Sequence, residues 1–296
     1  MDGILLIDKP SGPTSFDIVR AVRRAANERK VGHAGTLDPL ASGLLVVGIR
    51  QGTKLIQFLM DSEKRYLAEV ALGDETDTDD ALGVVTQEKP VPSISRDMLE
   101  DTLAGFIGKI KQTPPKYSAL KEGGEPLYRK ARRGENVTPK TREVEIRSIE
   151  LTDLSERRFS IDVRCGKGTY IRALARDVAR SLGTLGHLTA LRRIETSGFR
   201  VDEAMPLADL ESASKHERLV KKVISLAEAL PALPKIILSP EDETKIRHGQ
   251  PMLVAEVPKA IDLADGTHVS LLTKENNLCA IARLDGDQLR PVRGIT

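Results

Sequence analysis

Two segments alternate apolar and polar side chains, and this alternation constrains the fold of the chain more than any other feature. Apolar residues occupy every second position in residues 65–72 and again in residues 159–165. A period of two predicts β-strands that bury one face. After the second strand we expect a helix that is capped by Thr169, ends at Gly183 and carries one apolar stripe: Ile171, Leu174, Val178 and Leu182.

The first hundred residues predict further strands and helices. Residues 3–7 and 44–47 are short apolar runs, and we expect each to form a buried strand. Ser15 is a typical N-cap residue, so we expect a helix to start there. Residues 95–105 predict another short helix. The apolar face of the helix after Ser15 would consist of Phe16, Val19, Val22 and Ala26.

Residues 113–138 combine successive prolines, paired glycines and much of the positive charge. Residues 116–147 contain nine Lys or Arg and five Glu, although the whole chain has a net charge of only +2. We expect a mobile excursion from the core that carries a short helix. A segregated basic region can hold a polyanion on one face. A solvated helix surface would explain the charge equally well.

The last third of the chain predicts a separate small domain. Residues 205–230 are polar and predict helix, Pro231 and Pro234 mark a boundary, and short strand-like pieces with turn residues follow. A chain of 296 residues fits one large and one small domain. The two cysteines form no CxxC motif, no apolar run is long enough to cross a membrane, and no secretory signal opens the sequence. We therefore expect a cytoplasmic protein without a structural zinc site.

Residues 32–45, GHAGTLDPLASGLL, surround a single carboxylate with three glycines and a proline. Such residues fix an unusual backbone path, and the leucines would bury its flanks. A lone carboxylate held in this way suits nucleophilic catalysis. A turn in which Asp38 only accepts backbone hydrogen bonds is the alternative, and the residues alone leave it open.

This segment resembles the catalytic motif of the TruB family of tRNA pseudouridine synthases. The opening LLIDKPSGPTS, the KRY and TDTDD segments, and the GTYIR segment resemble the same family in order and spacing, over most of residues 1–200. PPKYSALKEGGEPLYRKARRGE is similar to the insertion with which that family grips RNA. The C-terminal tail has a looser similarity to PUA-type RNA-binding domains.

The resemblance implies an α+β fold with a mixed, largely antiparallel sheet. It implies a catalytic domain over residues 1–230, with the basic insertion at about 113–140, and a β-rich PUA-like domain over residues 234–296. The implied reaction isomerises uridine 55 in the T-loop of tRNA to pseudouridine after the base is flipped out. It gains no atoms or electrons, so we expect no cofactor and no metal. The implied partner is the T-arm of tRNA, bound by a monomer that requires no protein partner.

The resemblance also assigns the site residues. It makes Asp38 the essential carboxylate, pairs it with Arg172, and makes Tyr66 the tyrosine that stacks on the base. Standing alone, Arg172 would more simply pair with Asp177 on a helix surface, and the tyrosine would be a core residue. Substrate-binding roles are implied for a larger set: His33, Tyr170, Lys9, Leu191, Arg129, Arg132 and Arg133.

Two alternatives for the function stay open at this point. A guide-RNA-dependent, dyskerin-like synthase would share these motifs, and an RNA-folding chaperone could retain the fold.

Two further patterns do not predict sites. The acidic segment after Asp77 lacks the ligand and glycine spacing of a calcium loop. Cys165 falls on the apolar face of its strand, so we expect burial rather than a reactive thiol.

Overall fold

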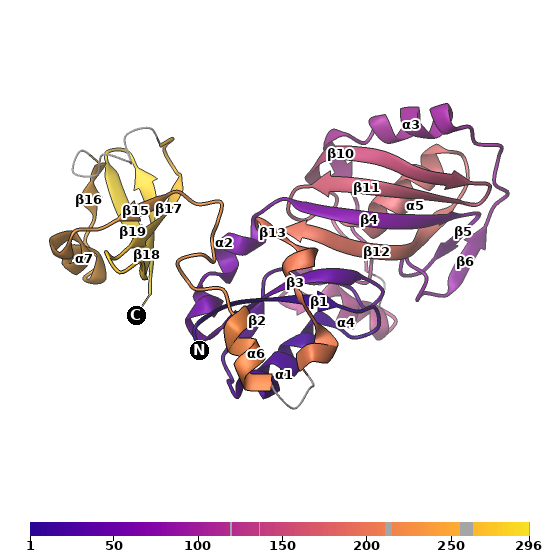
Figure 1. Ribbon diagram of the computed structural model, residues 1–296. Helices are drawn as coiled ribbons and strands as arrows, with labels where there is room; N and C mark the ends of the chain where they lie inside the picture. The colour runs from indigo at the N-terminus through magenta and orange to yellow at the C-terminus, as the bar shows by residue number, and fades with distance from the viewer. Residues whose placement is uncertain (119, 136, 211–214, 255–262, 296) are drawn as a thin grey trace.

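The computed structural model describes residues 1–118, 120–135, 137–210, 215–254 and 263–295. Its larger part is built on one mixed sheet in the order β14-β1-β3-β12-β4-β11-β10-β7, with β2 paired to β3 and β13 to β12 (Figure 1). Only β1–β14 and β3–β12 are parallel among the pairs of this sheet in the described residues. The expected α+β fold with a largely antiparallel sheet is therefore confirmed. The strands are β1 Gly3–Lys9, β2 Val31–His33, β3 Ser42–Ile49, β4 Lys64–Leu72, β7 Gly108–Gln112, β10 Arg142–Ser155, β11 Arg158–Cys165, β12 Gly186–Thr196, β13 Phe199–Arg200 and β14 Met205–Pro206.

The alternating segments form neighbouring strands of this sheet. β4 and β11 pair antiparallel with Tyr66 opposite Val163, and their alternate residues are buried: Tyr66, Ala68, Val70, Leu72, Phe159, Ile161, Val163 and Cys165. The helix α5, Ile171–Ser181, covers this face with Leu174 and Val178 fully buried in the same core. One helix thus shields the centre of the sheet, as the period-two pattern requires.

Seven α-helices lie in the described residues: α1 Ser15–Ala26, α2 Ile56–Met60, α3 Arg96–Ala104, α4 Leu127–Arg132, α5 Ile171–Ser181, α6 Lys215–Lys222 and α7 Pro240–Arg247. Short 3-10 turns lie at Arg50–Lys54, Val201–Glu203 and Leu207–Leu210. None of the helices in the described ranges is long and apolar enough to cross a membrane. α3 is capped by Ser95 and ends at Gly105, as expected.

Two helix starts differ from the sequence expectation by one residue. Thr14, not Ser15, caps α1, because its side chain and that of Asp17 form a reciprocal capping box. α5 has Tyr170 rather than Thr169 at its N-cap position.

The exposure of Phe16 also differs from the prediction. Phe16 is 55% exposed and lies beneath two arginines, Arg20 and Arg23. Ile18 is buried instead.

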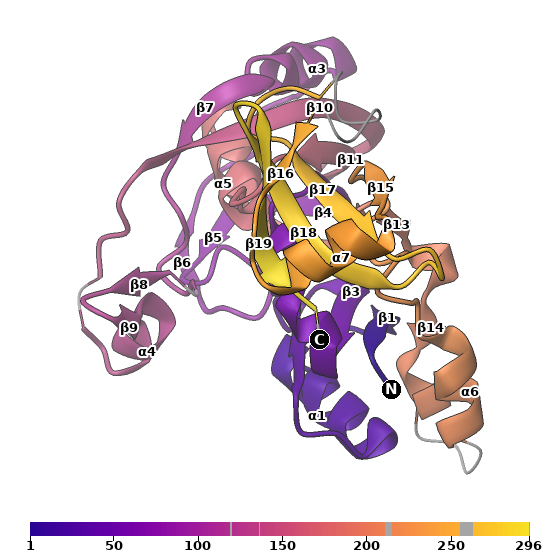
Figure 2. The same ribbon diagram turned by 90° about the vertical axis from the view of Figure 1, so that its left-hand side faces the viewer.

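The basic insertion, residues 113–140, leaves the body of the protein as a projecting arm (Figure 2). The arm consists of a two-stranded hairpin and the short helix α4; the strands are β8 Lys121–Glu122 and β9 Glu125–Pro126. A second small hairpin, β5 Asp74–Thr76 with β6 Val85–Glu88, carries the acidic segment. The expected short helix in the excursion is confirmed.

A C-terminal β-rich domain stands apart from the large sheet in Figure 1. Its sheet has the order β15-β17-β18-β19-β16. Leu272, Ile281 and Ile295 nevertheless share a hydrophobic cluster with Leu55 and Phe199 of the larger part. Its strands are β15 Lys235–Ile237, β16 Met252–Leu253, β17 His268–Leu272, β18 Leu278–Asp285 and β19 Gln288–Gly294.

The segment expected to be helical between residues 205 and 230 is mostly not helix. It begins with β14, continues through a 3-10 turn, and is α-helical only in α6; residues 211–214 lie outside the described part. Met205 pairs in parallel with Ile7 of β1, and Ile224 forms a bridge with Ile4. The open edge of the sheet therefore captures this segment, and tertiary pairing outweighs its local helix propensity.

Candidate active site

The Asp38 loop, residues 34–41, joins β2 to β3 and is fixed from below. Ser15 Oγ donates to the Leu37 carbonyl at 2.9 Å and accepts from the Leu37 N–H at 2.8 Å. The Gly12 N–H donates to the Pro39 carbonyl at 2.8 Å. Gly35 has φ +97°, a conformation that favours glycine. The loop therefore presents Asp38 on a backbone that α1 and the β1 turn hold in place.

Lys9 lies behind this loop with none of its surface exposed. Its ammonium donates to the carbonyls of Pro10 at 2.9 Å, Pro13 at 2.8 Å and Pro39 at 3.5 Å. Burial lowers the pKa of Lys9 to about 8, although the nearby Asp38 charge opposes this shift. Lys9 thus supports the loop from behind and does not line the pocket in front of it.

Arg172 lies against the carboxylate of Asp38. Its Nε is 2.9 Å from Asp38 Oδ2, and the side chain is only 5% exposed, against 35% for Asp38. This contact is an ion pair; among the described residues the Nε–H has no partner in hydrogen-bond geometry. The other nitrogens donate to the carbonyls of Thr78 at 2.7 Å and Tyr117 at 3.0 Å. Arg172 therefore connects the Asp38 loop to the acidic segment and the basic insertion.

Arg172 belongs to a row of arginines along α5 that face the acidic segment. Arg176 pairs with Asp79 at 2.7 Å and Arg180 pairs with Glu75 at 2.7 Å, while Arg172 Nη1 lies 3.6 Å from Asp80. The spacing of four residues places the three guanidinium groups on one side of the helix. The acidic segment is thus a docking partner of α5. Asp177, the partner that Arg172 would have on a helix surface, pairs with Arg176 at 2.9 Å instead.

A pocket of about 550 Å³ opens in front of Asp38, and we call it the Asp38 pocket. It brings together five residues that the sequence assigns to the site: Asp38, Tyr66, Tyr170, Arg172 and Leu191. These residues come from the Asp38 loop, β4, the start of α5 and β12. Segments far apart in the chain therefore converge on one carboxylate.

The floor of the Asp38 pocket is formed by neighbouring strands. Tyr66 on β4 lies directly opposite Arg193 on β12, and Ala68 lies opposite Leu191. Tyr66 is 7% exposed, and burial raises the pKa of its hydroxyl while the Arg193 charge opposes that shift. Tyr170 forms a wall: its backbone is held by Gln112 through bonds of 2.9 and 3.1 Å, and the Arg142 guanidinium lies 4.8 Å from its ring centre.

His33 lies in a different pocket, of about 870 Å³, which shares Asp38 and Arg172 with the first. Arg129 of the basic insertion lines this second pocket as well. Burial, together with the Arg193 charge, lowers the pKa of His33, so the imidazole is neutral at pH 7. The wall also includes Phe16, Tyr117 and Tyr128. Asp38 therefore stands between two hollows, one of them lined by aromatic side chains.

The other basic residues of the insertion lie differently. Arg133 donates to Glu125 at 2.9 Å and lies 2.7 Å from Glu135, so two carboxylates neutralise its charge. Arg132 ends α4, but its side chain lies outside the described part of the structure. Arg129 is exposed. Of the two arginines whose side chains are described, Arg129 is thus the one that lines a pocket.

Comparisons with known proteins show the family of the chain. The sequence model of the TruB family pseudouridylate synthase N-terminal domain matches residues 23–171. That of the tRNA pseudouridylate synthase B C-terminal domain matches residues 172–238. The tRNA pseudouridine synthase B of Syntrophotalea carbinolica is 40% identical over 99% of this chain and 95% of its own length. The chain belongs to the TruB family of pseudouridylate synthases.

Further relatives extend the TruB-family match. The tRNA pseudouridine synthase B of Xanthomonas campestris pv. campestris strain B100 is 44% identical over 84% of this chain and 82% of its own length. A chain in the crystal structure of a Cbf5-Nop10-Gar1 complex has a TM-score of 0.77 at 24% identity, covering 99% of this chain and 85% of that chain. At this identity the likeness shows the fold alone.

The TruB-family resemblance did not predict four basic residues of the Asp38 pocket: Lys64, Arg142, Lys167 and Arg193. Lys64 lies beside Tyr66 in a motif that had drawn attention only to the tyrosine. Arg193 is 1% exposed, and its guanidinium donates to the carbonyls of Leu44 at 2.7 Å and Gly35 at 3.2 Å. The pairing of β12 with β4 would have found Arg193, because it places this residue opposite Tyr66.

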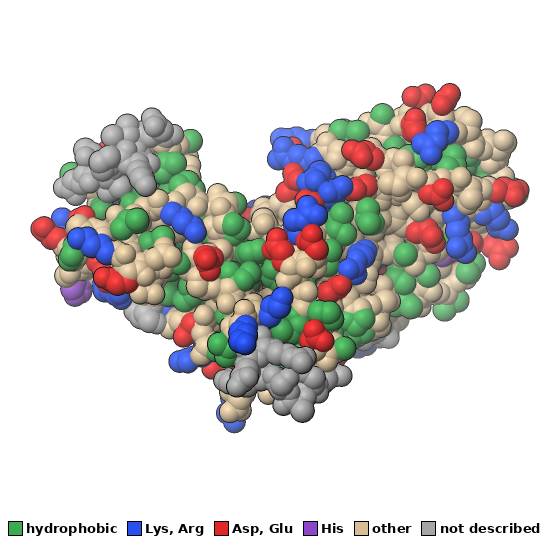
Figure 3. All heavy atoms as spheres, in the orientation of Figure 1, with side chains coloured by type: hydrophobic (Ala, Val, Ile, Leu, Met, Phe, Trp, Pro, Cys, Tyr) green, Lys and Arg blue, Asp and Glu red, His purple; other side chains and the backbone are tan. Residues whose placement is uncertain are grey.

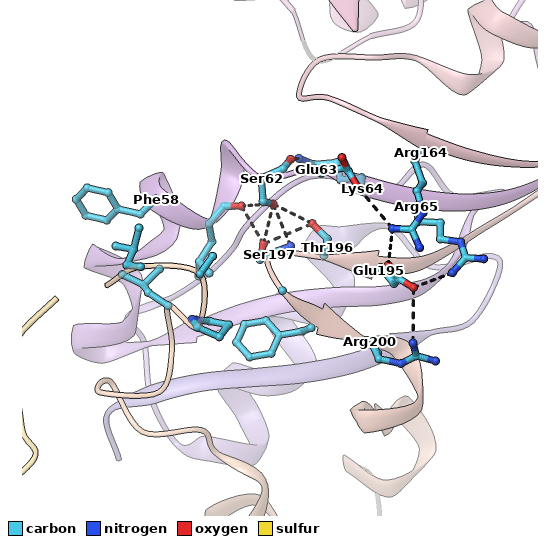
Figure 4. Close-up of a pocket in the computed structure, with 17 residues that line it drawn as sticks. Phe58, Ser62, Glu63, Lys64, Arg65, Arg164, Glu195, Thr196, Ser197 and Arg200 are labelled. Atoms are coloured by element: carbon cyan, nitrogen blue, oxygen red, sulfur yellow. Dashed lines mark hydrogen bonds and ion pairs between the residues drawn. The ribbon is translucent and has the colours of Figure 1, made fainter. Parts of the chain in front are cut away.

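A third pocket, of about 650 Å³, is lined by residues 230–233, the linker to the C-terminal domain. It shares Lys64 with the Asp38 pocket. Figure 4 shows Arg65, Arg164 and Arg200 around Glu195. The distances from Glu195 to these arginines are 2.9, 3.1 and 3.7 Å. On the face seen in Figure 3, Lys and Arg side chains gather beside the notch between the two domains.

Proposed function

We propose that this protein isomerises uridine 55 in the T-loop of tRNA to pseudouridine, with Asp38 as the essential carboxylate. The observation that carries the proposal is the placement of Asp38, 2.9 Å from a buried Arg172, in a pocket with Tyr66, Tyr170 and Leu191. A buried guanidinium beside the carboxylate fixes its orientation. Relatives that are 40–44% identical are named tRNA pseudouridine synthase B, which supports tRNA as the substrate.

The chemistry is an exchange of one bond for another. The bond between N1 of uracil and C1′ of the ribose breaks, the base turns, and a bond forms between C5 and C1′. A proton leaves C5 and N1 gains one, so atoms and electrons balance and no redox group takes part. Asp38 would act at the sugar or the base, and buried Tyr66 would stack on the uracil and take part in moving the C5 proton.

The target uridine must leave its stack to reach Asp38. Flipping costs a few kcal/mol, and an aromatic lining offsets part of this cost. Tyr170 and Leu191 would hold the flipped base, and His33 in the adjoining pocket would fill space left by displaced nucleotides. A neutral imidazole can stack there without a desolvated charge. Arg129 would contact a phosphate, and Lys9 would support the loop.

The remaining parts of the chain would position the RNA. We assign residues 1–230, including the basic insertion at 113–140, to catalysis and the PUA-like residues 234–296 to binding a distant part of the tRNA. The basic side chains beside the notch between the domains give the polyanion a path. We propose that the protein works as a monomer in the cytoplasm and needs no partner protein.

A guide-RNA-dependent synthase is the second candidate, because the Cbf5 complexes share the fold. The more similar relatives are named tRNA pseudouridine synthase B, which favours tRNA as the substrate. The test is to incubate the purified chain with a tRNA T-arm stem-loop and quantify pseudouridine at position 55 by chemical labelling. We expect conversion without added protein or RNA. A stem-loop with cytidine at that position is the control. No conversion by folded protein would contradict the proposal.

A further inference from the structure

Lys64 and Arg193 are two cations in the Asp38 pocket that have no carboxylate partner among the described residues. Arg193 is 1% exposed and donates to backbone carbonyls. Lys64 Nζ donates to the carbonyls of Met60 at 3.0 Å and Ser62 at 2.6 Å. The two charges act on each other, and both residues line the pocket that Asp38 lines. The pocket therefore holds unneutralised positive charge.

Other arginines show that this arrangement is unusual within the molecule. Three arginines are buried in the described part of the structure: Arg172, Arg176 and Arg193. Arg172 faces Asp38 and Arg176 faces Asp79, and only Arg193 faces neither Asp nor Glu. In the neighbouring hollow, Glu195 lies among three arginines (Figure 4). Arg193 and Lys64 are thus available to interact with a negative charge on the substrate.

Electrostatics favours this reading of the pocket. A buried cation without an anion carries a desolvation cost, and two close cations add repulsion. Carbonyl dipoles offset only part of that cost. A pocket that keeps both charges is preorganised to stabilise negative charge, which is most effective where water is excluded. Asp38 does not supply this charge, because Arg172 pairs with it.

The depth of Arg193 distinguishes the two anions that RNA could bring. A backbone phosphate stays at the rim, where Lys167 is 65% exposed and also lines the pocket. Arg193 lies under the loop, between the Gly35 and Leu44 carbonyls and opposite Tyr66. A flipped base reaches this depth. The negative charge at the floor would therefore belong to the base.

We propose that Arg193 and Lys64 stabilise the negative charge that uracil acquires when its bond to the ribose breaks. The inference rests on the proposed function. Heterolysis of the N1–C1′ bond leaves the electron pair on N1, and resonance spreads it to the carbonyl oxygens. The guanidinium and the ammonium would face these atoms. The charge disappears when C5 bonds to C1′, C5 loses its proton and N1 is protonated.

The test compares two leaving groups in variants of the full chain. Fluorine at C5 withdraws electrons, so the 5-fluorouracil anion needs less stabilisation than the uracil anion. We expect Lys64→Met to slow cleavage of the N1–C1′ bond of uridine in a T-arm by ~100-fold, and that of 5-fluorouridine by only ~10-fold. Single-turnover loss of the N-linked nucleoside measures both rates, and a binding titration measures affinity.

Two further variants keep the result interpretable. Arg193→Lys retains charge at the floor and should also slow cleavage of uridine more than cleavage of 5-fluorouridine, to a smaller extent than Lys64→Met. Arg192→Gln removes the neighbouring charge, which pairs with Asp8 at 2.7 Å outside the pocket, and should leave the substrate ratio unchanged.

Equal losses on the two bases in Lys64→Met and Arg193→Lys would overturn the proposal and assign a structural role. Weaker binding with unchanged single-turnover rates would overturn it in favour of a phosphate contact. Failure of the unaltered protein to convert uridine would instead contradict the proposed function.

Discussion

At the scale of the residue, the proposed function separates two tasks that mutation can distinguish. We propose that Asp38 carries the chemistry, whereas phosphate contacts supply the RNA affinity. Without Asp38, Arg172 keeps the carbonyls of Thr78 and Tyr117 and the carboxylate of Asp80. It is therefore not left as an unpaired buried charge.

We expect Asp38→Ala to abolish pseudouridine formation, retain tRNA affinity within about 2-fold, and destabilise the protein by about 1 kcal/mol or less. Chemical detection of pseudouridine, a binding titration and urea unfolding check the three parts. The isosteric Asp38→Asn should also be inactive. A folded Asp38→Ala protein that still converts uridine would disprove the catalytic assignment.

Lys64 predicts a pH dependence. Burial, helped by the Arg193 charge and opposed by Cys165 and Asp61, lowers the pKa of its ammonium from 10.5 to about 8. The ammonium is therefore lost as pH rises through about 8, and we expect the single-turnover rate to fall there. Between pH 8 and 10.5 the unfolded chain binds more protons at this lysine, so its contribution to stability rises with pH.

Lys9 has a similar pKa, so matched variants must separate the two lysines. Lys64→Arg should move the alkaline fall in rate to higher pH, because a guanidinium stays charged. Lys9→Arg should leave the contribution of Lys64 in place. Rates measured from pH 6 to 10 with both variants test this, and an unchanged profile in Lys64→Arg would exclude Lys64 as the titrating group.

At the scale of the element, the arginine row on α5 predicts a gradient of stability. Arg176 and Asp79 are each 10% exposed, whereas Arg180 is 52% exposed. Breaking a buried pair leaves an uncompensated charge and costs about 3–5 kcal/mol, while a surface pair contributes about 0–1 kcal/mol. We expect Arg176→Ala to lower the free energy of unfolding by about 3 kcal/mol and Arg180→Ala by under about 1 kcal/mol. Urea denaturation measures both; equal effects would contradict the gradient.

The basic insertion predicts unequal roles for its arginines. Arg129 is exposed and lines the second pocket, which contains His33, whereas Arg133 is paired with Glu125 and Glu135. Each phosphate contact contributes about one unit to the salt dependence of binding. We expect Arg129→Ala to lower the slope of log affinity against log salt by about one unit, and Arg133→Ala to lower it less. Equal slopes in the two variants and the unaltered protein would show that neither arginine contacts phosphate.

Sequence patterns correctly predicted the features that depend on neighbouring residues. They failed for features that depend on contacts between segments far apart in the chain. Alternation found Tyr66 and Cys165 on buried faces because period two depends only on the strand itself. Arg193 was not predicted as a site residue, because its place in the pocket depends on its pairing with β4, over a hundred residues earlier in the chain. Residues 205–206 pair with an open sheet edge that no local window contains. The capping Thr14 was missed because the adjacent Ser15, an equally good cap by type, holds the Leu37 backbone instead.

At the scale of the whole molecule, the C-terminal domain is joined to the larger part by packing as well as by a linker. Phe58 lies edge-on to His268, with ring centres 5.3 Å apart, and Lys54 Nζ donates to the Gly294 carbonyl at 3.1 Å. Leu55 and Phe199 are covered in the shared cluster. Removal of the C-terminal domain would expose part of this apolar surface.

We expect deletion of residues 234–296 to lower the melting temperature by several degrees and to weaken tRNA binding more than it slows the chemical step. The residues proposed for catalysis all precede the deletion. Calorimetry, binding titrations and single-turnover rates at saturating protein test these effects. A folded truncation whose single-turnover rate collapses would place the tail in the active site.

The contacts of Arg172 with three segments limit how the sequence of such a protein can evolve. One guanidinium fastens segments at residues 38, 78 and 117, so none of the three can be redesigned in isolation. If the basic insertion became shorter during evolution, Arg172 would lose the Tyr117 carbonyl as a hydrogen-bond acceptor. Arg172, and with it the Asp38 carboxylate, would then be held less firmly. We therefore expect natural variation in the insertion to spare the backbone at Tyr117 and to accumulate beyond it, toward the tip of the arm.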